Sequence, residues 1–153
     1  MSRLLMLRIV LGIICASHLL LGAVAFAGLP GGAAETVASL YGGSFPAGSL
    51  TPQLQHVGRM LGAYMLAMAL LAGVAAADPL RNRVGILVIA LLFLERVLQR
   101  LLFAGEAQQA FAIPPGRMWA QTLFFLAFPV ALLLLYPRTG TTGNGPTVTA
   151  AES

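Results

Sequence analysis

A short charged segment follows an apolar stretch that would suit a lipid bilayer. Residues 84–94 carry no charge, and Glu95, Arg96, Gln99 and Arg100 come directly after them. Charged side chains at membrane depth are costly, and they face other protein groups, a water-filled cavity or a partner. On a helix, Arg96, Gln99 and Arg100 share one face, while Glu95 lies about 100° away from Arg96.

Three interpretations of this polar segment follow. It can form salt bridges and hydrogen bonds that fix how the helices pack, it can line an outward-facing pocket, or it can meet a partner subunit that supplies a further acid. A pocket of this kind would suit an anionic or carbonyl-bearing ligand, such as a lipid headgroup or a quinone. Glu95 is the deepest and shortest of these side chains, whereas Arg100 lies near the membrane interface and can extend to headgroups.

Two histidines and a further arginine are the other candidate binding residues. His18 lies about 15 Å from Arg8 along a continuous helix, near the bilayer midplane. A single histidine in a membrane is typically an interhelical hydrogen-bonding residue. His56 and Arg59 share a helical face near the outer surface, where they could join the polar segment. The difference in depth between His18 and His56 argues against a shared haem, and no clustered ligands indicate a metal site.

Composition places the chain in a membrane. The 153 residues are 58% hydrophobic and 9% charged, whereas a soluble domain has about 25% charged residues. The net charge of +4 comes from arginine alone, without a basic run that would indicate nucleic-acid binding. No hydrolase, nucleotide-binding or metalloprotease motif is present, and we predict no catalytic residues.

The hydropathy pattern predicts an all-α, polytopic four-helix bundle over residues 1–138. A membrane helix needs about 20 apolar residues, and four segments meet this requirement, at residues 4–26, 57–77, 84–103 and 118–136. Pro129 should bend the fourth. Residues 139–153 are predicted to form a disordered cytoplasmic tail because they contain little apolar surface.

Loop arginines predict the orientation. Arg3, Arg8, Arg81, Arg83 and Arg138 fall on one side when the chain crosses four times, and arginine-rich ends are cytoplasmic. Both termini are therefore predicted to be inside. The long loop from residue 28 to residue 56 and the short loop at 105–116 lie outside. Within the long loop, residues 33–41 predict a short extra helix, and Thr51 and Pro52 predict the start of the second long helix.

The first apolar stretch also has features of a secretory signal. Arg3 precedes it, and Ala25, Phe26 and Ala27 resemble a cleavage site. Cleavage would leave three spans. The stretch is long for a signal peptide and contains His18, which favours a retained helix.

Small residues on the second span predict close helix packing. They are Gly58, Gly62, Ala63, Ala67, Ala69, Ala72 and Gly73, with a GxxxG pair at 58 and 62. The spacing is compatible with two helical hairpins.

The layout resembles a broad group of small bacterial four-helix membrane proteins, the DoxX-like and BphX-like proteins. The similarity rests on the span layout, on GRMLG at residues 58–62 and on ADPLRNR at residues 77–83. It implies a bacterial inner-membrane location, and some members look like subunits of quinone-linked redox systems. We therefore expect either an accessory subunit or lipid-like ligand binder, or a quinone-linked redox subunit. Its partners would be the bilayer and either another membrane protein or further copies of itself.

Overall fold

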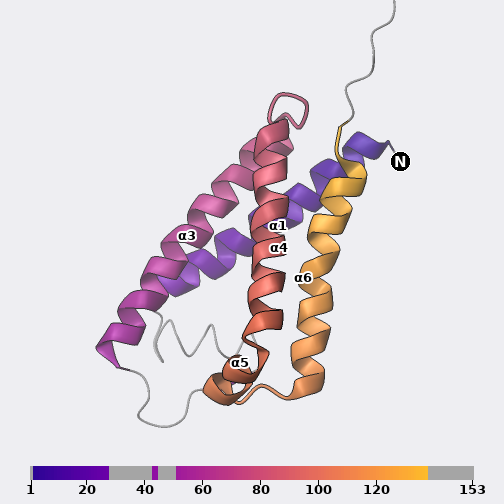
Figure 1. Cartoon of the computed structure of the whole chain (residues 1–153). Coiled ribbons are helices and arrows are strands. Elements are labelled where there is room, and N and C mark those ends of the chain that lie inside the picture. Colours follow the sequence, from indigo (N-terminus) through magenta and orange to yellow (C-terminus); the bar gives the residue numbers. More distant parts are fainter. Residues whose placement is uncertain (1, 28–42, 45–50, 138–153) are drawn as a thin grey trace, which may run out of the picture.

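The computed structural model describes residues 2–27, 43–44 and 51–137, and the elements within these ranges are all helices. The helices are α1 (Arg3–Ala27), α3 (Pro52–Ala77), α4 (Arg83–Leu102), α5 (Ala104–Phe111) and α6 (Pro115–Leu135) (Figure 1). The extra helix predicted at residues 33–41 and the tail at 139–153 lie outside the described residues.

The start of α3 confirms the capping prediction. The Thr51 hydroxyl accepts a hydrogen bond from the Leu54 amide at 3.2 Å, and Pro52 occupies the first helical position. At the other end of α3, the Asp78 carboxylate accepts a bond from the Arg81 amide at 3.1 Å. Pro79, which cannot continue a helix, is buried in this turn. Side-chain chemistry close to each end therefore determines where α3 begins and ends.

Three of the long helices have the length and apolarity to cross a membrane. They are α1, α3 and α6. The charges of Glu95, Arg96 and Arg100 give α4 a more polar composition. Large apolar side chains cover the outside of the molecule, with Leu20, Leu70 and Leu134 each about two-thirds exposed or more. Such an apolar exterior is suited to lipid, and it indicates membrane embedding.

The segment at 105–116, expected to be a loop, contains α5, so that expectation was wrong. Alanine, glutamate and glutamine dominate this segment and favour helix. The helix ends at Phe111, and the next residue, Ala112, adopts a left-handed backbone conformation with φ 50°. Pro114 and Pro115 follow and separate α5 from α6. Residues 105–116 resembled a loop because the helix is short and has little apolar surface.

The long helices form two pairs, α1 with α3 and α4 with α6. Figure 1 shows α1 passing diagonally behind α4. The start of α1, the turn between α3 and α4 and the end of α6 lie at the same end of the molecule. Two arginines join these parts, because Arg3 donates to the Leu134 carbonyl and Arg8 donates to the Ala77 carbonyl at 3.3 Å. Cations are favourable at helix C-termini, where carbonyl groups lack helical partners.

A continuous core joins both pairs. It is formed by fully or almost fully buried apolar residues, namely Leu7, Leu11, Ile14, Ala72, Ala75, Ile86, Ile89, Ala90, Phe93 and Leu132. Those from α1 recur every three or four residues, so one stripe of the helix faces the core. Pro129 is buried in α6, and the helix continues through it.

Helices α1 and α3 approach each other closely at Gly22 and Gly62. A Cβ atom added to Gly62 would lie 2.6 Å from the Phe26 nitrogen and 3.0 Å from the Gly22 carbonyl oxygen. The obstructing atoms are backbone, so a rotamer change cannot make space. The GxxxG pattern had predicted close packing, and the structure identifies Gly62 as a contacting residue.

We predict that Gly62→Ala destabilises the protein. The added methyl group must separate α1 from α3, and overpacking of this kind costs about 1–3 kcal/mol. Gly12→Ala is the matched control, because a Cβ on Gly12, also within a helix, meets nothing within 4 Å. Unfolding in detergent, followed by circular dichroism, measures both. A Gly62→Ala protein as stable as the Gly12→Ala protein would contradict the contact.

Candidate functional site

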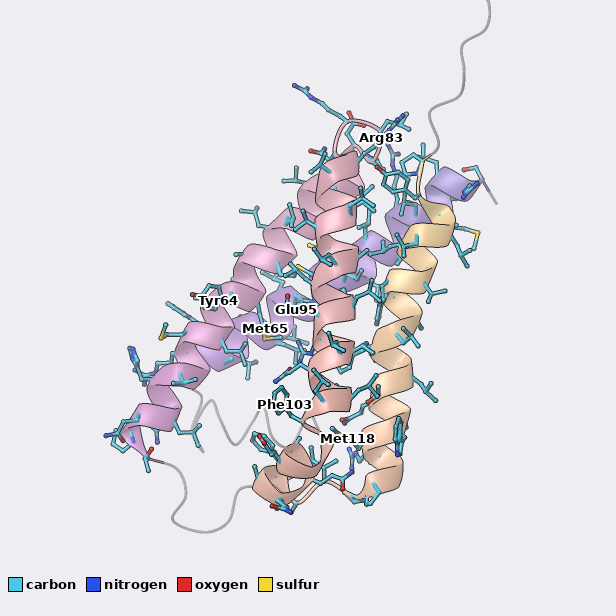
Figure 2. The ribbon with its side chains drawn as sticks, viewed as in Figure 1. Tyr64, Met65, Arg83, Glu95, Phe103 and Met118 are labelled. Carbon is cyan, nitrogen blue, oxygen red and sulfur yellow. The ribbon has the colours of Figure 1, made fainter. Side chains whose placement is uncertain are left out.

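A polar cavity lies beside the second half of α4. It has a volume of about 520 Å³ and receives side chains from α3, α4, α5 and α6. The charged and amide side chains in its described lining are Glu95, Arg96, Gln99 and Arg100. Figure 2 shows Glu95 on the side of α4 that faces α3, with Phe103 nearer α5. The polar segment singled out in the sequence therefore lines one cavity.

Arg96 and Arg100 converge on the same aromatic ring of α6. The guanidinium carbon of Arg96 lies 4.6 Å from the centre of the Phe125 ring, and that of Arg100 lies 5.1 Å from it. Both Nη atoms of Arg100 also donate to Oε1 of Gln121, at 3.3 and 2.9 Å. Arg96 and Arg100 are four residues apart on α4, and Gln121 and Phe125 are four residues apart on α6. Each pair therefore lies on one face of its helix, and the two faces meet. These contacts with Gln121 and Phe125 hold the two arginine side chains against α6.

Glu95 and Gln99 form a second row on α4. Their spacing of four residues places them on one face, and both side chains are exposed, whereas Arg96 and Arg100 are only partly exposed. The sequence pattern had grouped Gln99 with the arginines. In the structure, the arginines contact α6, and Gln99 lies with Glu95 along the open side of the cavity.

An aromatic cavity lies next to the polar one. It has a volume of about 250 Å³, and its walls come mainly from α1, α4 and α6. The residues that line it are Ile13, Ser17, His18, Leu21, Met65, Phe93, Arg96, Gln121, Phe124, Phe125 and Phe128. A third, smaller cavity of about 150 Å³ is also lined by His18 and Arg96. Arg96 belongs to all three linings, so it lies where the cavities approach one another.

His18 is buried between these aromatic groups. Its Nδ1 atom lies 2.9 Å from the Ile14 carbonyl oxygen, one turn earlier on α1. Because a carbonyl only accepts, Nδ1 carries the proton, and Nε2 of the neutral ring is an acceptor. The ring also meets Phe93 edge to face, with centroids 5.7 Å apart. The hydrogen bond expected between helices is thus a bond within α1, and the ring itself makes the contact with α4.

His56 and Arg59 do not line the cavity that the polar residues of α4 line. Both side chains are exposed on α3. The described linings of the three cavities include neither residue, and they do not include Arg117. Of the candidate residues, Glu95, Arg96, Gln99 and Arg100 line the polar cavity, and His18 joins Arg96 in the aromatic one.

Sequence reasoning did not identify Gln121 and Phe125. Gln121 is an amide within a mainly apolar helix, and Phe125 follows four residues later on the same face. An isolated amide in a membrane helix is a recognisable signal for an interhelical bond. Its partner could not be identified from sequence, because that depends on how α4 and α6 are aligned.

A part of the first loop lies against the polar cavity. The Ser44 amide donates to the Phe111 carbonyl at 3.0 Å. A Cβ on Gly43 would collide with that carbonyl and would lie 3.1 Å from a side-chain carbon of Ile113. Phe111 and Ile113 both line the cavity. Glycine at position 43 therefore allows the loop to approach the cavity wall.

Within residues 2–27, 43–44 and 51–137, no group of three histidine, cysteine or acidic residues could hold a metal ion. Comparison of the chain with protein-family models, with curated proteins and with solved structures finds no match in any of the three.

We predict that Gly43→Ala breaks the contact between the first loop and α5. The methyl group would occupy the space of the Phe111 carbonyl, so the Ser44 amide should lose its partner. Hydrogen exchange of a peptide containing Ser44 should therefore become faster. Gly105→Ala is the control, because a Cβ there meets nothing within 4 Å. Unchanged exchange in Gly43→Ala would show that the loop tolerates the methyl group.

Proposed function

We propose that this protein is a non-catalytic, four-span membrane protein that holds a lipid-like molecule in its polar cavity, either as an accessory subunit or on its own. The proposal places it in a bacterial inner membrane with both termini in the cytoplasm. This location rests on the arginine distribution and on the resemblance to DoxX-like proteins.

The distribution of side chains on α4 supports a fourth span. The helix has 20 residues, which corresponds to about 30 Å, the thickness of a bilayer core. Val84, Leu91 and Leu98 recur every seven residues and are 74%, 64% and 54% exposed. Such a row suits contact with lipid. Arg83 is the first residue of α4, and the other charged residues, Glu95, Arg96 and Arg100, lie in the second half of the helix, beside the polar cavity.

The observation that carries the binding proposal is the convergence of Arg96 and Arg100 beside a cavity of about 520 Å³. Ligand pockets commonly have volumes of about 300–1,000 Å³, with apolar walls and a few convergent polar groups. Here, Phe103, Phe111 and Met118 supply apolar wall. The two guanidinium groups supply positive charge, which is costly in a membrane unless a structure or ligand uses it.

A partner subunit remains part of the proposal. Glu95 is exposed on α4, and an acid at membrane depth is favourable only when it meets polar groups or water. A second membrane protein, or a second copy of this chain, could cover the open side of the cavity. The resulting complex would bury Glu95 and Gln99 together.

The alternative is a quinone-linked redox subunit. Its support is the aromatic cavity, in which His18 and Arg96 share a lining with Phe93 and Phe128. A flat ring could pack against these aromatic groups, and Arg96 could donate to one of its carbonyls. A co-purified quinone would favour this function. A quinone-free preparation that retains a lipid would favour the first.

We predict that Arg96→Leu reduces ligand retention, and that Glu95→Gln reduces assembly with a partner, more than Arg117→Gln does. Removing a hydrogen bond to a charged group costs about 1.5–3 kcal/mol, so retention should fall about tenfold or more for Arg96→Leu. Arg117 is the control because it is exposed and outside the described cavity lining. Native mass spectrometry of the protein in mild detergent measures bound lipid and partners. Equal losses in all three variants would contradict a special role for the cavity.

A further inference from the structure

We propose that the ligand is a single-chain amphiphile with an anionic headgroup, held by Arg96 and Arg100, and that its chain enters the aromatic cavity beside His18. This inference rests on the proposed binding function and specifies its ligand class. The carboxylate of a fatty acid and the phosphate of a monoacyl lipid share the required chemistry, which is a compact anion on one apolar chain.

The headgroup position follows from the two arginines. Both contact the Phe125 ring, and Arg100 is additionally held by Gln121, so their positions are determined by α6. Guanidinium groups present several N–H donors in a plane and match carboxylate or phosphate oxygens well. Two of them beside one cavity favour an anion over a neutral or cationic headgroup. Glu95 belongs to the other row of α4 and lies on the open side.

The chain position follows from Arg96. This residue lines both the polar cavity and the aromatic cavity, so the aromatic cavity lies beside the group that holds the headgroup. Leu21, Met65, Phe124 and Phe128 give the second cavity an apolar wall. Its volume is about half that of the polar cavity, 250 against 520 Å³. The smaller space favours one chain over the two chains of a phospholipid.

The membrane setting determines which part of the ligand gives selectivity. An apolar chain leaves lipid or detergent and enters an apolar cavity, so the transfer itself contributes little free energy. The headgroup is different, because it gains contacts with two fixed cations. The structure therefore predicts strong discrimination by headgroup charge, together with a limit on the size of the apolar part.

The first test compares ligands that share one chain. The full-length protein in a neutral detergent is titrated with dodecanoate, dodecanol and dodecylamine at mildly alkaline pH, and binding is measured by native mass spectrometry. We expect dodecanoate to bind at least tenfold more tightly than dodecanol, and dodecylamine to bind more weakly still. Acetate and inorganic phosphate test for a free anion. Equal binding of the acid and the alcohol, or binding of a free anion as tight as that of dodecanoate, would overturn the proposal.

The second test uses matched variants. Arg96→Gln should remove the preference for the acid, whereas Arg117→Gln should keep it. Leu21→Trp should fill the aromatic cavity and weaken dodecanoate binding about tenfold. Leu20→Trp, at a neighbouring position that is 67% exposed, should leave binding unchanged. If Arg96→Gln and Arg117→Gln have equal effects, or if Leu21→Trp and Leu20→Trp do, the proposed positions of headgroup and chain are wrong. If Arg96→Gln does not fold, the comparison of dodecanoate, dodecanol and dodecylamine in the unmodified protein still decides the proposal.

The outcomes separate this inference from the function on which it rests. If the protein retains a neutral or zwitterionic lipid in an Arg96-dependent manner, the binding function stands and the anionic single-chain ligand is wrong. If no lipid is retained in an Arg96-dependent manner, both proposals fail.

Discussion

The backbone contact between α1 and α3 is the constraint on which the described structure depends. At Gly22 and Gly62, no side chain separates the two helices, so they approach more closely than larger residues would permit. His18 precedes Gly22 by one turn and is therefore turned toward the same neighbours, including Met65. The stripe of Leu7, Leu11 and Ile14 continues from this face into the core formed with α4 and α6. One contact thus aligns the histidine and the core of α1 together.

The divergence of α3 and α4 accounts for the position of the polar cavity beside α5. In Figure 1, α3 and α4 are close at the turn that joins them and diverge toward the α5 end. Larger and more polar side chains are present where the helices diverge, and Arg96 lies there between three cavities. A charge at this position is less costly than one facing lipid, because the Phe125 ring and polar groups surround it. The same divergence that prevents tight packing therefore provides the space of the polar cavity.

The sequence predicted those features that depend on short-range patterns. Apolar length located the long helices to within a few residues, and the Thr51–Pro52 pair located the start of α3. The spacing of the polar residues on α4 predicted that they could line one pocket, and Glu95, Arg96, Gln99 and Arg100 do line one cavity. The contacts of Arg100 with Gln121 and of Ser44 with Phe111 could not be predicted, because each joins segments whose relative alignment results from the packing of several helices. The helix α5 was not predicted because it is short and has too few apolar residues to show a helical hydrophobic pattern.

The arrangement of α4 explains how a helix with four charged residues can still suit a membrane. The mean hydropathy of α4 combines residues on sides of the helix that have different surroundings. Ile86, Ile89 and Phe93 face the core, and the row containing Val84, Leu91 and Leu98 is exposed. Arg96 and Arg100 lie toward the core-facing side and contact α6, whereas Glu95 lies next to Leu91 and Leu98 on the exposed side. The energetic cost of a charge depends on what its own face meets, so a mean hydropathy cannot distinguish this helix from a soluble one. If α4 does cross the bilayer, its charges are tolerated because the cavity, and whatever occupies it, surrounds them.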